Sequence, residues 1–197
     1  YQLAQEQSVQ GLVLQGAEWL RNHKDKFTIP QVLLLQWIGE VQVIEQRNKA
    51  MNAFIAEIIA ALRDQDIFAL LVKGQGVAQC YERPLWRSCG DIDFFFSMED
   101  YIKAKVYLTP LASSFRAEGD TGNHLELTIG QWIVELHGDL GNGLSYRMDK
   151  VLKEIQDTII FKGGVRSWVN GDTQVFLPAS TEDVIFVFTH IIKHLFM

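Results

Sequence analysis

The sequence predicts an α+β protein in which a helical N-terminal segment precedes a mixed β-sheet with helices. Residues 1–66 carry apolar side chains at helical spacing. Residues 67–179 contain short apolar runs separated by turns, and two of these turns have the glycine that a tight hairpin requires. Residues 180–197 are amphipathic and predict the start of a C-terminal helix. We therefore expect three parts with these boundaries.

Composition excludes several classes of protein. The chain has 197 residues, 48% of them hydrophobic and 21% charged, which suits one globular domain with at most a small extension. A net charge of -6 argues against a broad nucleic-acid-binding surface. The two cysteines, Cys80 and Cys89, are too few for a disulfide framework and lack zinc-ligand spacing. Without a signal peptide or a stretch of transmembrane length, we expect a cytoplasmic protein that does not act at a membrane.

The helical segment has one predicted break, at Thr28–Pro30, and a long helix is expected from Val32 to Leu62. Proline suits the first turn of this second helix because its missing N–H is not needed there. The ends of the chain look interrupted: no initiating Met is present, and the last residues stop inside an amphipathic helix without a C-cap. We expect the natural chain to continue into further helix, which could hold part of the site.

Alternating strands and helices are predicted after Asp66. Ser97 begins a capping pattern that should start a helix ending near Pro110. Asn170-Gly171 predicts a second hairpin near the C-terminus. The expected strands are 67–72, 90–96, 114–118, 124–129, 132–137, 165–169 and 173–177, and the expected helices are 76–81, 97–108 and 146–155.

The most informative motif is Gly90-Asp91-Ile92-Asp93, followed by Phe94–Phe96. Side chains alternate along a strand, so Asp91 and Asp93 point to the same side. A simpler interpretation makes Asp91 a turn residue and Asp93 a surface residue on an edge strand. Three consecutive phenylalanines argue instead for a strand buried on both faces. Two carboxylates there are costly unless a cation lies between them, and Mg²⁺ is the first candidate.

A predicted hairpin supplies a further acid. Gly130-Gln131 suits a two-residue turn, and that register gives one wholly apolar face. The other face places Glu126 opposite Glu135 and His124 opposite His137. Like charges directly opposite each other destabilise a sheet, so one glutamate is expected to meet a metal or an arginine. The alternative is an exposed polar face with both glutamates in water, and the histidines are expected to hydrogen-bond across the strands.

Taken together, these residues resemble a known family. The pattern is Lys73-Gly74 after a strand, then Tyr81, Pro84, Arg87, Gly-Asp-Ile-Asp93 and Val-Glu-Leu-His137. It is similar to the uncharacterised bacterial nucleotidyltransferase family of the DNA-polymerase-β-type superfamily, and the similarity covers most of the chain. The resemblance implies a nucleotidyltransferase-like mixed sheet.

The same resemblance implies site residues and chemistry. Asp91, Asp93 and Glu135 would bind Mg²⁺ or Mn²⁺, with two metal ions about 4 Å apart. The implied nucleotide-binding residues are Lys73, Gly74, Gln75 and Arg87. The implied reaction is attack of an acceptor hydroxyl on the α-phosphate of an NTP, with ATP as first candidate, and release of pyrophosphate. Glu135 could also help deprotonate the acceptor. Lys73 and Arg87 could clamp phosphates or could instead pair with neighbouring carboxylates.

The acceptor is not identified by the sequence. It could be a small hydroxylated molecule, a sugar, a protein side chain or an RNA end, the last disfavoured by the acidic charge. The superfamily commonly has Gly-Ser where this chain has Gly74-Gln75, which leaves open an inactive module that binds nucleotide for regulation or scaffolding. A metal-dependent glycosyltransferase also uses Asp-x-Asp, but it normally needs several βα units before the motif. Asp93→Asn is expected to abolish transfer and leave the fold intact.

Overall fold

The computed structural model describes residues 1–23, 28–118, 123–141 and 145–196, and it confirms the α+β class. The chain divides into two compact units. The first comprises residues 1–52 and 78–89, and the second comprises residues 53–77 and 90–197. The proposed domain boundaries at residues 66 and 179 remain a prediction. No helix in the described ranges combines the length and the apolar character that crossing a membrane requires.

The first unit is helical, as predicted. It contains α1 (Gln2–Glu6), α2 (Gln10–His23), most of α3 (Gln31–Arg63) and a 3-10 turn, η1 (Pro84–Trp86). Pro30 lies directly before α3, where its fixed φ favours helix initiation. The core of this unit is a cluster of buried side chains from α1, α2 and α3: Ala4, Leu14, Trp37 and Val41.

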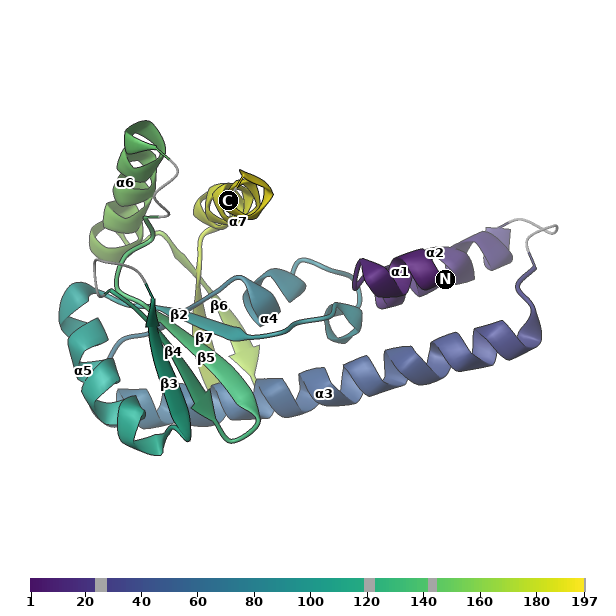
Figure 1. The fold of residues 1–197 in the computed structure, drawn as a ribbon, viewed down its shortest axis with the longest axis horizontal. Coiled ribbons are helices and arrows are strands. Elements are labelled where there is room, and N and C mark those ends of the chain that lie inside the picture. Colours follow the sequence, from purple (N-terminus) through teal and green to yellow (C-terminus); the bar gives the residue numbers. More distant parts are fainter. Residues whose placement is uncertain (24–27, 119–122, 142–144, 197) are drawn as a thin grey trace. The chain divides into compact units, whose positions relative to one another are not determined.

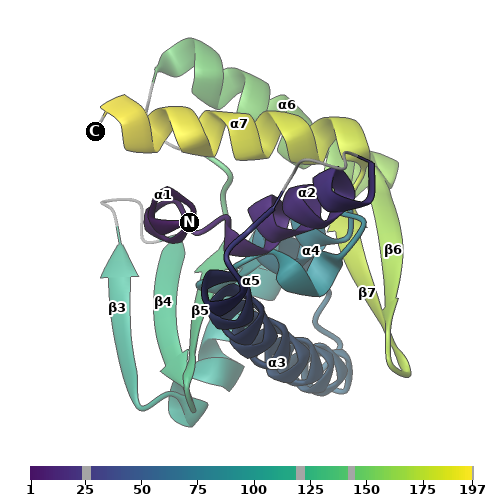
Figure 2. The ribbon, with the colours of Figure 1, turned by 90° about the vertical axis from the view of Figure 1, so that its right-hand side faces the viewer.

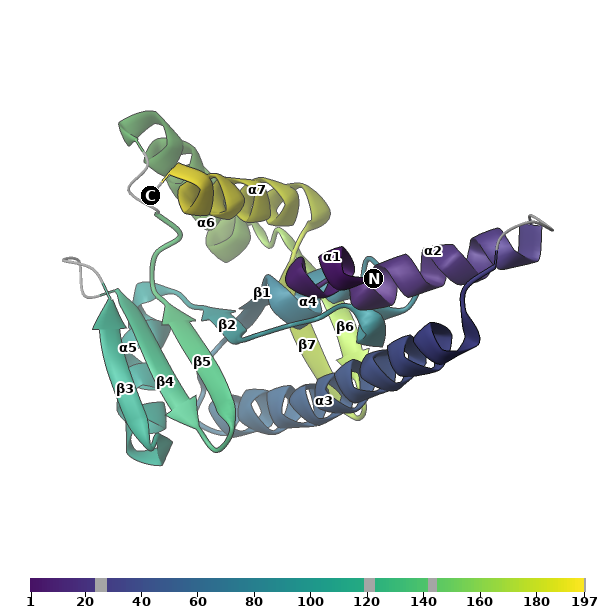
Figure 3. The ribbon, with the colours of Figure 1, turned by 45° about the vertical axis from the view of Figure 1, so that its right-hand side comes forward.

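A seven-stranded mixed sheet forms the second unit, in the order β3-β4-β5-β2-β1-β7-β6 (Figures 1 and 3). Strands β1 and β7 and strands β2 and β5 pair in parallel, whereas the other neighbours are antiparallel. The strands are β1 (Leu70–Val72), β2 (Ile92–Phe95), β3 (Ser114–Glu118), β4 (His124–Ile129), β5 (Trp132–His137), β6 (Val165–Asn170) and β7 (Thr173–Pro178).

Helices cover both faces of this sheet. On one face, α6 (Tyr146–Lys162) and α7 (Ser180–Phe196) lie together (Figure 2). Their apolar side chains pack with Leu70, Val72 and Phe95. The other face packs against α5 (Met98–Leu108) and the C-terminal part of α3 (Figure 1). Phe54 of α3 and Trp132 of β5 make a ring contact on this face. Strand β2 is therefore buried on both faces, as the run of phenylalanines predicts.

The predicted hairpin register is confirmed residue by residue, with His124 opposite His137 and Glu126 opposite Glu135. Its apolar face is buried, including Leu125, Leu127, Val134 and Leu136. Ser97 is the N-cap of α5, and its hydroxyl accepts a hydrogen bond from the Asp100 N–H at 3.1 Å. Turn chemistry and alternation fix these elements locally, so the sequence was sufficient to predict them.

Other boundaries differ from those expected. Strand β1 begins at Leu70 instead of residue 67, and the short helix α4 spans Gly74–Ala78 instead of 76–81. Helix α6 extends to Lys162, seven residues beyond the expected end, and stops at Gly163 in the left-handed conformation. Asp91 lies just before β2. Strand length depends on which partner strands are available, and this information is tertiary.

Candidate active site

The candidate site lies where strands β1, β2 and β5 adjoin in the second unit. Val72 is opposite Asp93 in the β1–β2 pair, and Asp93 is opposite Glu135 in the β2–β5 pair. Asp91, Asp93 and Glu135 offer carboxylate oxygens that all lie within 4.8 Å of one another. The structure thus brings together the three acids that the sequence analysis singled out.

Asp93 is the innermost of these acids, with an exposed fraction of 0%. Its Oδ1 accepts from the Lys73 ammonium at 2.5 Å and lies 2.9 Å from His137 Nε2. Its Oδ2 is buried as well, and no described residue donates a hydrogen bond to it. A buried carboxylate oxygen without a partner carries a large desolvation cost, so this oxygen is suited to a cation.

The turn after β1 aims Lys73 at Asp93. Lys73 has a φ of 55°, the left-handed region that costs a residue with a Cβ about 1–2 kcal/mol. Gly74 follows with a φ of 29°, and a Cβ added there would lie 3.3 Å from the Asp91 carbonyl oxygen. Glycine therefore allows the turn to approach the strand that carries the acids. Strained backbone of this kind clusters at functional sites.

Glu135 faces three cationic or hydrogen-bonding groups. Its Oε2 lies 3.3 Å from His124 Nε2, 3.4 Å from His137 Nε2 and 4.0 Å from Lys73 Nζ. Hydrogen bonds from His124 and then His137 hold the pKa of Glu135 far below its usual range, although burial opposes this shift. Glu135 is consequently an ionised ligand and a weak base.

The two histidines meet as stacked rings, with centroids 4.5 Å apart and planes 11° from parallel. His124 does bond across the strands as expected, but its partner is Glu135. Burial lowers the pKa of His137, and hydrogen bonds to Asp93 and Glu135 outweigh it, so the net pKa is raised. One of the two opposing glutamates meets an arginine, as expected: Glu126 forms an ion pair with Arg116 at 3.1 Å, which reduces its repulsion of Glu135.

Asp91 differs electrostatically from the other two acids. It is partly exposed, and burial, Asp93 and Glu135 together raise its pKa, against the opposing effect of Lys73. Among the described residues, Lys73 and a protonated His137 offset only part of the charge of the three carboxylates. This donor set fits Mg²⁺ or Mn²⁺, which prefer carboxylate oxygens.

The predicted nucleotide-binding residues are only partly assembled. Lys73 and Gly74 form the turn beside the acids. Of the two roles that the sequence left open for Lys73, a phosphate clamp or an ion pair with a carboxylate, this structure shows the ion pair, with Asp93. Gln75 is 1% exposed as a whole residue, so both its side chain and its backbone are buried in this turn. Arg87 belongs to the first unit, where its guanidinium lies 3.0 Å from Cys89 Sγ, and its phosphate contact remains a prediction.

Sequence reasoning missed a support for this turn. Arg166 on β6 donates to the carbonyls of Gly76 at 3.2 Å and Pro178 at 3.1 Å, and to Asp183 Oδ2 at 3.0 Å. Asp183 lies in the first turn of α7 and forms an ion pair with Arg166. No local pattern indicates this network, because its members come from three distant segments.

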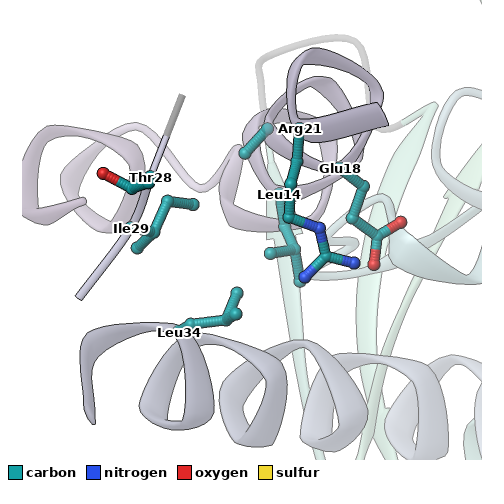
Figure 4. A pocket seen from close by; sticks show the side chains of 7 residues that line it. Leu14, Glu18, Arg21, Thr28, Ile29 and Leu34 are labelled. Carbon is teal, nitrogen blue, oxygen red and sulfur yellow. The ribbon is translucent and has the colours of Figure 1, made fainter. Parts of the chain in front are cut away.

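A hollow of about 230 Å³ in the first unit has a different character (Figure 4). Leu14, Ile29 and Leu34 converge on it, with Glu18 and Arg21 to one side. It contains no group of metal-ligating side chains among the described residues, and Glu18 already pairs with Arg83 at 2.7 Å. The chemistry-bearing residues therefore gather in the second unit.

Comparison with known proteins agrees with this geometry. A family model described as "Uncharacterised nucleotidyltransferase" matches residues 1–197. No curated protein and no solved structure matches the chain. The match covers both compact units and supports a nucleotidyltransferase function.

Proposed function

Because the chain belongs to this family of uncharacterised nucleotidyltransferases, we propose that it transfers a nucleoside monophosphate from an NTP to a hydroxyl acceptor and releases pyrophosphate. We extend the proposal to a mechanism of the DNA-polymerase-β type, with ATP as the first candidate nucleotide and the cytoplasm as the location. The observation that carries it is the group of three carboxylates at the adjoining strands β2 and β5, in which Asp93 Oδ2 is buried without a hydrogen-bond partner among the described residues.

Asp91, Asp93 and Glu135 would hold the divalent ion, Mg²⁺ or Mn²⁺. Such an ion, when bound, neutralises the charge that develops on the transferring phosphoryl group. Asp93 is fixed by Lys73 and His137, and Glu135 is fixed by both histidines. Ligands held by such partners keep their orientation without reorganising during the reaction.

Lys73 has a second role in the proposal. Its ammonium lies 2.5 Å from Asp93 and 4.0 Å from Glu135, so in the absence of other cations it compensates both carboxylates. Once divalent ions bind, Lys73 would turn to the β- and γ-phosphates. Backbone N–H groups at Gly74 and Gln75 would contact the same phosphates.

In the proposed reaction, the acceptor oxygen forms a bond to the α-phosphorus as the bond to the bridging oxygen breaks. Pyrophosphate leaves with that electron pair, and the hydroxyl proton passes to a carboxylate. Glu135 is a poor proton acceptor because its histidine partners depress its pKa. Asp91, which is partly exposed and is not hydrogen-bonded to either histidine, is the other candidate for the proton.

An inactive nucleotide-binding module is the second candidate. Its support is the buried Gln75 side chain at a position where the superfamily commonly offers a hydroxyl to the phosphates. The family match favours both nucleotide candidates over transfer of a sugar.

The test combines labelling with a matched variant. Wild-type protein would be incubated with α-labelled NTPs, Mg²⁺ or Mn²⁺ and cell extract, and labelled products would be identified while pyrophosphate release is followed. We expect label transfer that requires the metal and disappears in Asp91→Asn. Metal-dependent ATP binding without pyrophosphate release from any extract would support the inactive module, and binding of UDP-sugars in preference to NTPs would contradict both.

A further inference from the structure

In the proposed transfer reaction, the two histidines beside the acids only hold Asp93 and Glu135 in place and bind no ion themselves. His124, Glu135 and His137 each offer one ligand atom, and these atoms also lie within 4.8 Å of one another. This second group shares only Glu135 with the group of three carboxylates. From this geometry we infer that His124, Glu135 and His137 form a separate metal site, which takes a divalent transition ion such as Zn²⁺ or Co²⁺.

The donor set determines which ions fit. Imidazole nitrogen suits Zn²⁺ and related transition ions, whereas Mg²⁺ requires an octahedral shell dominated by oxygen. Two nitrogens and one carboxylate leave room for a solvent or substrate ligand, as in catalytic zinc sites. The chain thus presents an oxygen-only site and a nitrogen-containing site side by side.

The hairpin explains why the three ligands converge. His124 and His137 are directly opposite each other across β4 and β5, and Glu135 is two residues before His137 on the same face. The stacked rings direct both Nε2 atoms toward Glu135 Oε2, at 3.3 and 3.4 Å. An incoming ion would take the place of the proton that His124 Nε2 shares with Glu135 and of the proton that His137 Nε2 shares with Asp93 and Glu135. Each neutral ring would keep its proton on Nδ1.

Access and support also favour binding. The side chains of His124 and Glu135 are 23% and 18% exposed, so solvent ions reach them without unfolding. His137 is 12% exposed, and its Nε2 lies 2.9 Å from Asp93 Oδ1, a contact that the ion would replace. This site goes beyond the proposed function, because it depends on the hairpin and would bind an ion even in a protein that transfers nothing.

Cobalt provides a direct test that does not depend on activity. The full chain would be titrated with Co²⁺ while visible absorption is recorded, and paramagnetic NMR would detect histidine N–H protons shifted by the ion. We expect binding with imidazole signals, and affinity increasing from Mn²⁺ to Co²⁺. His124→Ala should weaken Co²⁺ binding at least about 10-fold, since loss of even an outer-shell partner has this effect.

Two matched variants complete the experiment. His23→Ala removes an exposed histidine of the first unit and should leave the imidazole signals and the affinity unchanged. Asp91→Asn disrupts only the carboxylate group and should also keep the imidazole signals. Failure to bind Co²⁺, oxygen-only ligation in the wild-type protein, or an unchanged spectrum in a folded His124→Ala variant would each overturn the inference. Absence of nucleotide transfer would leave these results unaffected and would count only against the proposed function.

Discussion

Two buried polar side chains, Asn48 in the first compact unit and Asp93 in the second, differ in how their hydrogen bonds are completed. Asn48 of the first unit is 1% exposed, and its amide donates to the carbonyls of Leu85 at 2.8 Å and Arg87 at 2.7 Å. Asp93 of the second unit is 0% exposed and leaves Oδ2 without a donor among the described residues. Asn48 ties α3 to the segment that contains Leu85 and Arg87. Asp93, in contrast, has one carboxylate oxygen that could still accept a ligand.

We interpret this difference as one between a structural polar group and a functional one. A buried polar side chain whose bonds close within the protein stabilises a particular packing. One that remains incompletely bonded is tolerated where an ion or substrate completes it. We therefore attribute stability to Asn48 and chemistry to Asp93, and the predictions below test this assignment.

The largest effect is expected for Asp93→Asn. It removes a proposed metal ligand and should lower transfer more than about 100-fold, beyond the loss seen for outer-shell partners. The sequence alone predicts an intact fold for this variant, but the ion pair between Asp93 and Lys73 predicts a loss of stability. The substitution leaves the Lys73 ammonium without its nearest carboxylate. We expect a cost of about 3 kcal/mol, measured by urea unfolding.

Asp91→Asn is the matched control for that stability change. Asp91 lies among like charges that raise its pKa, so its neutralisation relieves repulsion. The variant should be at least as stable as wild type without metal, yet equally inactive. Equal destabilisation by both substitutions would show that the Lys73 pair does not distinguish the two acids.

Asn48→Ala should affect stability and leave metal binding unchanged. Two carbonyls lose their donor, at about 1–3 kcal/mol each, so we expect a loss of about 3 kcal/mol in total. The affinity of the acidic group for Mn²⁺ should not change, because all its ligands belong to the second unit. A Mn²⁺ affinity that falls with Asn48→Ala in folded protein would contradict this separation of roles.

Gly11→Ala should weaken the first unit by packing alone. A Cβ added to Gly11 would overlap the backbone carbonyl of Trp86, which a backbone shift must relieve. Overpacking of this kind costs about 1–3 kcal/mol. Gly16→Ala is the control, since a Cβ there meets nothing within 4 Å. We therefore expect a lower unfolding temperature for Gly11→Ala than for wild type, and a smaller decrease or an increase for Gly16→Ala.

The smallest effect is expected at Ser97, the N-cap of α5. Ser97→Ala removes the acceptor of the Asp100 N–H and should cost about 1 kcal/mol. Ser97→Asp should retain most of that energy, because aspartate also caps helices well. Chemical denaturation would show whether the two variants differ; equal losses would assign the effect to something other than capping.

The sequence predicted the hairpin of β4 and β5 and the common face of Glu135 and the aspartates, because alternation and turn chemistry are local properties. It also predicted α+β architecture and a buried β2. The contacts of Lys73 and the network of Arg166 could not be predicted, since they depend on how β1, β2 and β6 are placed by the whole fold. The strand register predicts that the histidines lie on the same face as the acids. The stacking of their rings depends on side-chain rotamers, which the register does not determine.

The most direct test of the central claim is anomalous scattering from crystals grown with Mn²⁺ and a non-hydrolysable ATP analogue. The account predicts a Mn²⁺ peak bound by Asp91 and by the Oδ2 of Asp93, with the phosphates next to Gly74 and Lys73 moved toward them. A peak elsewhere, with Lys73 still paired to Asp93 while nucleotide is bound, would contradict the assignment of this group as the site of nucleotide transfer.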